Sequence, residues 1–256
     1  MFNYAIVRRP CTSYPQGITA ANLGQPELEE TIDQHAAYCA ALEKCGLHLT
    51  ILEPVPQYPD STFVEDTAVL TRECAILANP GADSRRGEVA AIEPAIARCF
   101  DNLHAILAPG TLDGGDICQV GNHFFIGISE RTNADGAQQL ASILVRYGYS
   151  SSLVDLRGLD GLLHLKSGIA YLGDRRLVLV RGMEKLANFD EYEIVNVDPD
   201  ENYAANCVRV NDYVLIAEGF HKIAARLTDI GYQILPVKVS EFQKMDGGLS
   251  CLSLRF

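Results

Sequence analysis

The chain has 256 residues, of which 48% are hydrophobic and 21% charged, a composition typical of a globular protein rather than a disordered or fibrous one. Its formal net charge of −12 disfavours nucleic acids and anionic membranes as partners and is compatible with a cationic ligand. The eight cysteines form no Cys-x-x-Cys pair, no stretch reaches membrane-spanning length, and the first residues lack a signal-peptide pattern. We therefore expect a cytoplasmic protein with reduced thiols and no zinc ribbon.

Four stretches have apolar residues at helical spacing and are expected to form helices: 27–45, 89–100, 135–147 and 221–230. Gly46, Gly148 and Gly231 directly follow three of them, and glycine after a helix is a common stop signal. An apolar run comes next in each case, so we expect helices and strands to alternate.

A strand, a tight turn and a second strand recur along the chain. Polar residues open these units at intervals of 50, 48, 42 and 45 residues: Asp66, Asp116, His164, Asn206 and Cys251. Repeats of this length are typical of propellers and arrays, which favours a closed ring of five βα modules. An ordinary open α/β sheet can have similar spacing, and the repeat alone does not separate the two.

The last unit places Cys251 behind a double glycine. Gly247 and Gly248 are expected to adopt backbone conformations that other residues resist, and so to bring the main chain close to a ligand. Cys251 is expected to begin a short strand over 251–254. A thiol in this position is either a nucleophile or one of several buried cysteines.

The side chains at or near the start of these units include types that can act as nucleophile, as base and as ligands of a cation. A cysteine and a histidine, here Cys251 and His164, form a nucleophile–base pair when a fold brings them together. Glu65, Asp66 and Asp113, facing one cavity, would repel each other unless a cation lay between them. Local metal-ligand spacing such as His-x-x-x-His is absent from this set, and a guanidinium is the organic alternative to a metal ion.

Two further polar residues have less specific interpretations. Asp116 is expected to fix the turn at Gly114 and Gly115 rather than contact a ligand. For Asn206 a structural and a functional role are equally open.

Seven motifs, in order along the chain, resemble those of one enzyme family. They are Phe63-Val-Glu-Asp66, Ser84-Arg-Arg-Gly-Glu88, Leu112-Asp-Gly-Gly-Asp116, Arg131-Thr-Asn133, Leu163-His-Leu-Lys-Ser167, Tyr203-Ala-Ala-Asn-Cys207 and Asp246-Gly-Gly-Leu-Ser-Cys251. Together they resemble the dimethylarginine dimethylaminohydrolases, members of the guanidine-modifying pentein superfamily. The resemblance implies a five-module, pseudo-symmetric α/β-propeller and a single catalytic domain over residues 1–256.

The activity implied by the resemblance is hydrolysis of Nω-methylated arginines, namely asymmetric dimethylarginine and monomethylarginine, to citrulline and a methylated amine. Cys251 is implied to attack the guanidinium carbon and form a covalent thiouronium, and His164 to carry the protons. Asp113 and Asp66 are implied to hold the guanidinium nitrogens, with Asp113 counted among the catalytic residues. The other residues implied to bind substrate are Glu65, Asp60, Phe63, Arg85, Arg131, Ile18 and Met245.

The resemblance also implies which groups bind the amino-acid end of the substrate: arginine side chains bind its α-carboxylate, and backbone groups bind its α-amino group. Arg85 and Arg131 are implied to grip the α-carboxylate, which suits a planar guanidinium, although the adjacent Arg86 leaves the choice within that pair open. Backbone groups of Ile18 and Met245 are implied at the α-amino group. No cofactor or metal is implied, since the guanidinium is itself an electrophile.

Three other functions are known for chains of this superfamily and are alternatives to this one. Arginine deiminases and amidinotransferases of the superfamily are usually longer, and a chain of 256 residues leaves no room for their additional helical domain. A non-catalytic pentein that binds a ligand or protein, like the ribosome anti-association factor of the same fold, need not keep the Cys, His and carboxylate set. The oligomeric state implied by the resemblance is a monomer or a homodimer.

Overall fold

Fifteen short strands form five three-stranded sheets with one shared topology in the computed structural model, which describes residues 1–159, 161–187 and 189–256. In each sheet the middle strand pairs antiparallel with one neighbour and parallel with the other. The parallel neighbour needs a crossover connection, and a helix or 3-10 turn supplies it. The chain divides into two compact units, residues 65–205 and residues 1–64 with 206–256.

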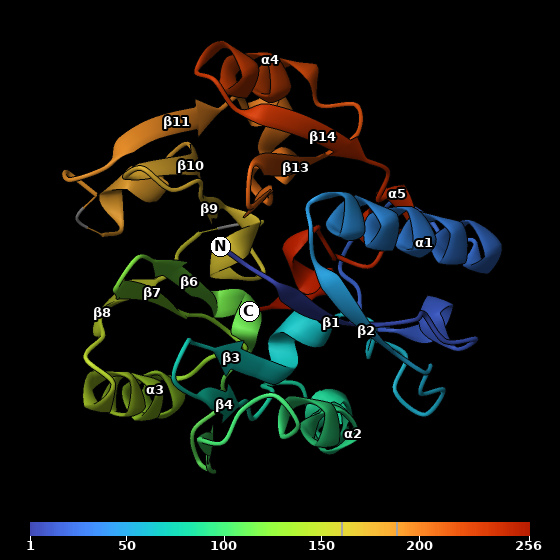
Figure 1. The fold of residues 1–256 in the computed structure, drawn as a ribbon, viewed down its shortest axis with the longest axis vertical. Coiled ribbons are helices and arrows are strands. Elements are labelled where there is room, and N and C mark those ends of the chain that lie inside the picture. The colour runs from blue at the N-terminus through green and yellow to red at the C-terminus, as the bar shows by residue number, and fades with distance from the viewer. Residues whose placement is uncertain (160, 188) are drawn as a thin grey trace. The chain divides into compact units, whose positions relative to one another are not determined.

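The unit of residues 65–205 contains three of these modules (Figure 1). Their elements are β3 Ala68–Leu70, β4 Ala75–Leu77, α2 Arg86–Ile96 and β5 Leu103–Ala105; β6 Ile117–Val120, β7 His123–Ile128, α3 Ala134–Arg146 and β8 Ser150–Asp155; and β9 Ile169–Tyr171, β10 Arg176–Val180 and β11 Glu193–Val197. In the third module the 3-10 turn Met183–Lys185 stands where the others have a longer helix.

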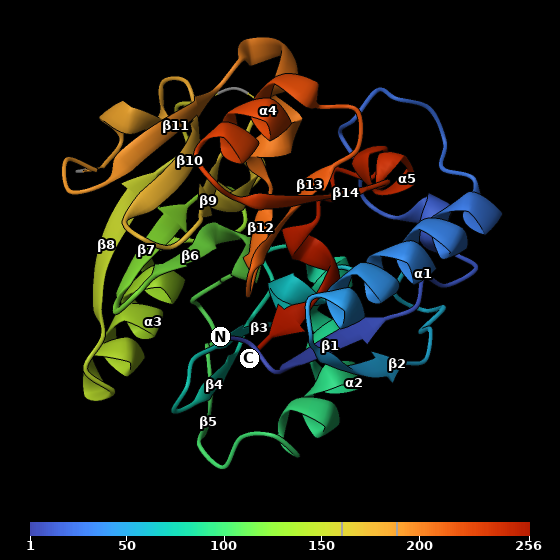
Figure 2. The same cartoon turned by 45° about the horizontal axis from the view of Figure 1, so that its top comes forward.

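The other unit contains the remaining two modules and both chain ends. Its elements are β12 Val208–Val210, β13 Tyr213–Ala217, α4 His221–Asp229 and β14 Gln233–Val237; β15 Leu254–Arg255, β1 Tyr4–Arg8, α1 Leu28–Lys44 and β2 His48–Leu52; and the short α5 Ser240–Gln243. The C-terminal β15 pairs antiparallel with the N-terminal β1, so the two ends lie side by side (Figure 2). The fifth module is therefore assembled from both ends of the chain, which the repeat did not predict.

All four predicted helices are present, with ends within a few residues of those expected. Helix α3 shows why: Ala137, Leu140 and Leu144 lie on one face and pack with Phe124 and Ile126 of β7 in a buried cluster. Each of the leucine, isoleucine and phenylalanine side chains contributes roughly 1.5–3 kcal/mol when it is fully buried.

The strand starts were predicted wrongly. Each first strand follows a 3-10 turn that contains or adjoins the polar opening residue: Val64–Thr67, Gly114–Asp116, Leu165–Ser167, Pro199–Ala205 and Ser250–Leu252. Cys251 thus lies in a turn, and the strand after it is β15. The local i to i+3 bonds of these turns, such as Cys251 N to Gly248 O at 3.2 Å, occupy backbone groups that a strand would direct to its neighbours.

All eight cysteines are free thiols. Among the helices that the structure describes, none combines the length and apolar character needed to cross a membrane.

Candidate active site

Hydrogen bonds join consecutive module turns within residues 65–205. The N–H of Gly115 donates to Asp66 Oδ1 at 2.9 Å, and the N–H of Leu165 donates to Asp116 Oδ1 at 3.0 Å. Buried backbone N–H groups need an acceptor, so each carboxylate holds the following turn in place. The Asp116 side chain holds the turn that follows His164, and not the Gly114–Gly115 turn that it was expected to fix.

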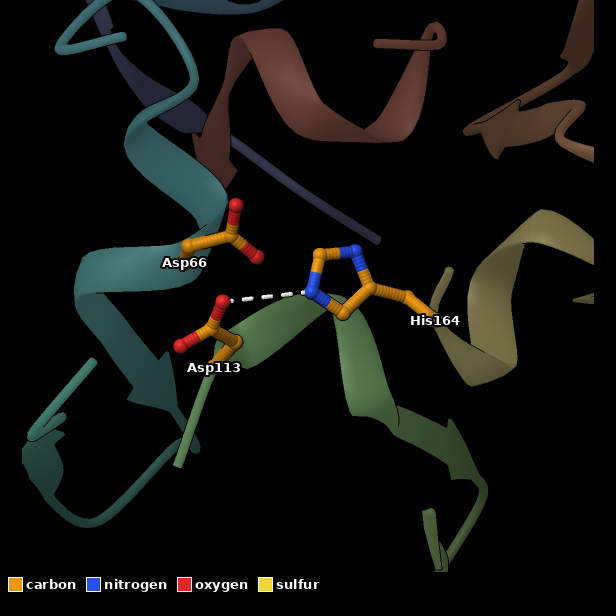
Figure 3. Close-up of side chains that lie close together, drawn as sticks. All are labelled: Asp66, Asp113 and His164. Carbon is orange, nitrogen blue, oxygen red and sulfur yellow. Dashed lines mark hydrogen bonds and ion pairs between the residues drawn. The ribbon is translucent and has the colours of Figure 1, made fainter. Parts of the chain in front are cut away.

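Asp66, Asp113 and His164 come from three modules and converge in one buried cluster (Figure 3). His164 Nε2 lies 3.2 Å from Asp113 Oδ2. Gly115 makes the approach possible, since a Cβ on it would lie 2.9 Å from both Asp66 Oδ1 and the His164 ring. The N–H of Gly81 donates to Asp113 Oδ1 at 2.9 Å and fixes the orientation of that carboxylate.

The electrostatics of this cluster favour a charged imidazole. Burial alone would lower the pKa of His164, but the negative charges of Asp66 and Asp116 and the hydrogen bond to Asp113 outweigh it and raise the pKa to about 9. Burial opposes ionisation of Asp66, yet the charges of His164 and Arg85 hold its pKa below the ordinary value. The cluster therefore keeps a proton on His164 at neutral pH.

Arg85 points inward and Arg86 outward. Arg85 is buried, donating from Nη1 to Asp66 Oδ2 at 2.6 Å and from Nη2 to Glu88 Oε2 at 2.8 Å. Arg86 pairs with Asp83 at the surface. Arg85 is thus the arginine of the pair that reaches the cluster, where its first role is to hold Asp66; the expected grip on a substrate carboxylate stays a prediction.

Arg131 belongs to the same unit and differs from Arg85 in its partners. Its backbone N–H donates to Ser129 Oγ, and its backbone packs against Gly81. Among the described residues, the Arg131 guanidinium makes no ion pair. This guanidinium is therefore the better placed of the two to bind an anionic group from outside the protein.

Glu65 is buried and pairs with Lys166, a residue that the sequence pattern did not single out. Lys166 Nζ lies 2.7 Å from Glu65 Oε1 and donates to the carbonyl oxygen of Gly114 at 3.3 Å. Lys166 and Glu88 lie within the family-like motifs Leu163–Ser167 and Ser84–Glu88, and this membership is the only sign in the sequence that they matter. The partner of Lys166 comes from another module, so the spacing along the chain does not predict which side chain it binds.

Cys251 lies in the other unit and is partly exposed. The N–H of Gly248 donates to its Sγ at 3.4 Å, a contact that favours the thiolate over the thiol. Neither Gly247 nor Gly248 has a positive φ, which corrects the expectation of an unusual backbone. The pair is required for space instead, because a Cβ on Gly247 would overlap the ring of Phe63 and one on Gly248 would lie 2.5 Å from Asn206 Oδ1.

Phe63 is enclosed within this unit, with Tyr14 and Phe242 edge-on to its ring. The structure thus gives it a packing role against Gly247, and direct contact with substrate stays a prediction.

Asp60, Ile18 and Met245 are neighbours in the same unit. The N–H of Ile18 donates to Asp60 at 3.1 and 3.2 Å from its two oxygens. The Asp60 carboxylate and the end of the Met245 side chain both pack against Gly17, where a Cβ would overlap the carboxylate. The buried Asp60 thus fixes the loop that carries Ile18, and Met245 packs beneath it.

Asp66, Asp113 and His164 are also residue types that bind metal ions, and one ligand atom from each lies within 4.8 Å of the others. Arg85 and backbone N–H groups already satisfy part of the two carboxylates. A planar guanidinium, which donates directed hydrogen bonds to carboxylates, suits what remains. The expectation that the site needs no metal or cofactor stays a prediction.

Comparison with known proteins places this geometry in context. The family model described as arginine deiminase matches residues 29–207. The chain is 42% identical to N(G),N(G)-dimethylarginine dimethylaminohydrolase of Pseudomonas aeruginosa, with 100% of both chains covered.

Two solved structures are similar over 100% of both chains at 42% identity. One is a cysteine-to-serine variant of the Pseudomonas aeruginosa enzyme complexed with citrulline, with a TM-score of 0.97. The other is a histidine-to-glycine variant of dimethylarginine dimethylaminohydrolase as an adduct with S-methyl-L-thiocitrulline, with a TM-score of 0.96. With five sheets of one topology, this likeness confirms the five-module pentein (α/β-propeller) fold class. The chain belongs to the dimethylarginine dimethylaminohydrolase family.

Proposed function

We propose that the protein hydrolyses Nω-methylated arginines to citrulline and a methylated amine. The observation that carries this function is the buried cluster of His164 with Asp113 and Asp66, which presents two carboxylates and one proton donor together. Carboxylates bind a guanidinium by charge-assisted hydrogen bonds, and a protonated imidazole can give its proton to a departing amine. The similar Pseudomonas aeruginosa protein, whose variant is complexed with citrulline, supports the same product.

Cys251 is the nucleophile of this proposal. Its thiolate attacks the guanidinium carbon, the bond from that carbon to the methylated nitrogen breaks, and a thiouronium remains on Sγ. Water then adds to the same carbon, the C–S bond breaks, and citrulline leaves with the thiolate restored. The hydrogen bond from the Gly248 N–H to Sγ supports the role, because it favours the reactive anion.

His164 is the general acid and base. Its raised pKa keeps the imidazole protonated at neutral pH, so it can protonate the departing amine. The neutral imidazole left behind can then take a proton from the attacking water. Asp113, hydrogen-bonded to Nε2, orients the ring and stabilises its charged form.

The remaining residues bind the substrate. Asp66 and Asp113 hold the guanidinium, and Arg131 with Arg85 holds the α-carboxylate. The other proposed contacts are Glu65, Asp60, Phe63 and the backbone groups of Ile18 and Met245.

The cellular location and the kind of partner proposed for the enzyme are supported by its thiols and its charge. A cytoplasm, where thiols stay reduced, suits the eight free cysteines and the thiolate chemistry. The net charge of −12 suits a small cationic amino acid as substrate and disfavours nucleic acids and anionic membranes. The family model matches residues of both compact units, which supports residues 1–256 acting as one catalytic domain. The proposed chemistry needs no cofactor or metal, because the guanidinium is itself the electrophile.

A citrulline assay with asymmetric dimethylarginine, monomethylarginine and arginine tests the proposal. We expect the methylated substrates to be preferred, and preference for arginine would make the protein a deiminase instead. Cys251→Ser should abolish citrulline release and the substrate adduct detected on the 251-containing peptide by mass spectrometry. Cys99→Ser is the matched control, because Cys99 is the exposed cysteine and lies outside the proposed machinery.

A further inference from the structure

Asn206 is hydrogen-bonded to the residue directly before Cys251. The N–H of Ser250 donates to Asn206 Oδ1 at 2.9 Å, and Asn206 Nδ2 donates to Ser250 Oγ at 3.0 Å. Both side chains are buried, and Arg255 Nη1 donates to the Ser250 carbonyl oxygen at 3.3 Å. Ser250 is therefore held at its N–H, its hydroxyl and its carbonyl.

The same Asn206 side chain also packs on the other end of the turn. A Cβ on Gly248 would lie 2.5 Å from Asn206 Oδ1, so the amide lies directly against the Gly248 main chain. Gly248 supplies the N–H that points at Cys251 Sγ. The Asn206 amide thus contacts Ser250, which directly precedes Cys251, and Gly248, whose N–H donates to Cys251 Sγ.

Asn206 stands where two other modules have aspartates. Asp66 and Asp116 accept the N–H of Gly115 and Leu165 from the next turn, as Asn206 accepts that of Ser250. Asp66 holds the turn beside Asp113, and Asp116 holds the turn beside His164, so a carboxylate is the acceptor in both places. At the turn of Cys251 the acceptor is the neutral amide of Asn206. A carboxylate in that place would oppose formation of the Cys251 thiolate.

We propose that Asn206 is a positioning residue for Cys251: its amide holds the 248–251 turn so that the Gly248 N–H meets Sγ, and its neutrality leaves the thiolate unopposed. The inference rests on the proposed role of Cys251 as nucleophile, and it deepens that role. It makes Asn206 part of what sets the reactivity of the thiol rather than part of the substrate contacts.

Two substitutions separate the geometric part from the electrostatic part. Asn206→Leu is similar in size and removes both hydrogen bonds to Ser250. Asn206→Asp keeps an acceptor for the Ser250 N–H, can accept from its hydroxyl, and adds a negative charge. Ser250→Ala is the matched control, because it removes the hydroxyl while leaving the backbone N–H bond to Asn206 Oδ1.

The experiment measures the rate at which iodoacetamide alkylates Cys251, by peptide mass spectrometry, across the pH range in which thiols titrate. Cys99 is exposed and serves as an internal reference in every sample, while the six buried cysteines report on unfolding. We expect Asn206→Leu to slow Cys251 alkylation at neutral pH by roughly tenfold, the change that one unit in the titration midpoint produces. The turnover number kcat should fall in parallel while KM for asymmetric dimethylarginine stays within about twofold, since no substrate contact is lost.

Asn206→Asp should behave differently. Its Cys251 alkylation profile should shift to higher pH and then reach the wild-type plateau, because the geometry is kept and only the charge is added. Ser250→Ala should stay close to the wild-type profile. Alkylation of Cys251 in Asn206→Leu at the wild-type rate and pH dependence, with Cys99 unchanged, would overturn the proposal.

A failure of the proposed function gives a different result. If Cys251 is not the nucleophile, Cys251→Ser retains citrulline release whatever the Asn206 variants do. If only the role of Asn206 is mistaken, Cys251→Ser is inactive and the Asn206 variants alkylate normally.

Discussion

Lys166 Nζ lies 2.7 Å from Glu65 Oε1, an ion pair between residues 101 positions apart in the chain. The same ammonium donates to the carbonyl oxygen of Gly114 at 3.3 Å. The Lys166 side chain thereby connects three 3-10 turns, each of which precedes the first strand of its module: Val64–Thr67, Gly114–Asp116 and Leu165–Ser167. Asp66, Asp113 and His164 lie in or directly before these turns.

Replacing Lys166 by Met should lower the free energy of unfolding by roughly 2–3 kcal/mol, because the buried Glu65 carboxylate loses its ion pair with Lys166. Urea denaturation followed by circular dichroism measures this. The double variant Lys166→Met with Glu65→Gln is the control and should recover most of the loss, since the buried negative charge is removed together with the positive one. Equal stability of the single and double variants would show that the pair does not act as a unit.

The pH–rate profile should follow the proton on His164. Because the reaction first needs the charged imidazole, kcat/KM should fall on the alkaline side as pH rises through the His164 pKa of about 9. Asp113→Asn removes a negative charge that helps to raise this pKa and leaves only a neutral acceptor for the imidazole, so the alkaline limb should move to lower pH, and activity at neutral pH should drop by at least roughly a hundredfold. Asp155→Asn, at an exposed aspartate paired with Arg157, should leave the limb in place. An unmoved limb in Asp113→Asn would assign it to another group.

Gly247→Ala should destabilise the protein by roughly 1–3 kcal/mol, because its new Cβ overlaps the ring of Phe63 and the enclosed ring has little space to move. Gly158→Ala is the matched control, since a Cβ there meets nothing within 4 Å and its φ is not positive. Thermal or urea unfolding of the two variants gives the comparison. Similar stabilities would mean that the turn before Cys251 tolerates a side chain.

Arg85 and Arg86 should respond differently to replacement by Lys. Arg85→Lys loses the fork that spans Asp66 and Glu88 and should cost roughly 2–4 kcal/mol of unfolding free energy. Arg86→Lys, at an exposed pair with Asp83, should change it by less than about 0.5 kcal/mol. Urea unfolding at constant pH measures both, and a stable Arg85→Lys would show that the buried fork adds little.

The sequence was sufficient for the local elements and for the number of modules. Helices such as 135–147 were predicted because Leu140 and Leu144 repeat at helical spacing. This spacing can be recognised in the sequence even when the surface that the helix packs against is unknown. The opening residues Asp66, His164 and Cys251 were also found, since their spacing along the chain follows the repeat. What spacing could not show was that these residues occupy 3-10 turns, because the acceptors that hold the turns lie one whole module away.

By itself, the sequence determined the helices, the fivefold repeat and the chemical types that the site could contain. Only the tertiary structure decided which of two adjacent arginines reaches Asp66, since neighbouring residues at the start of a helix point in directions roughly 100° apart. It also decided that Lys166 pairs with Glu65 and that Asn206 holds the turn of Cys251. Those contacts join residues 44 to 101 positions apart, and their strength depends on burial and on angles that exist only once the modules have folded.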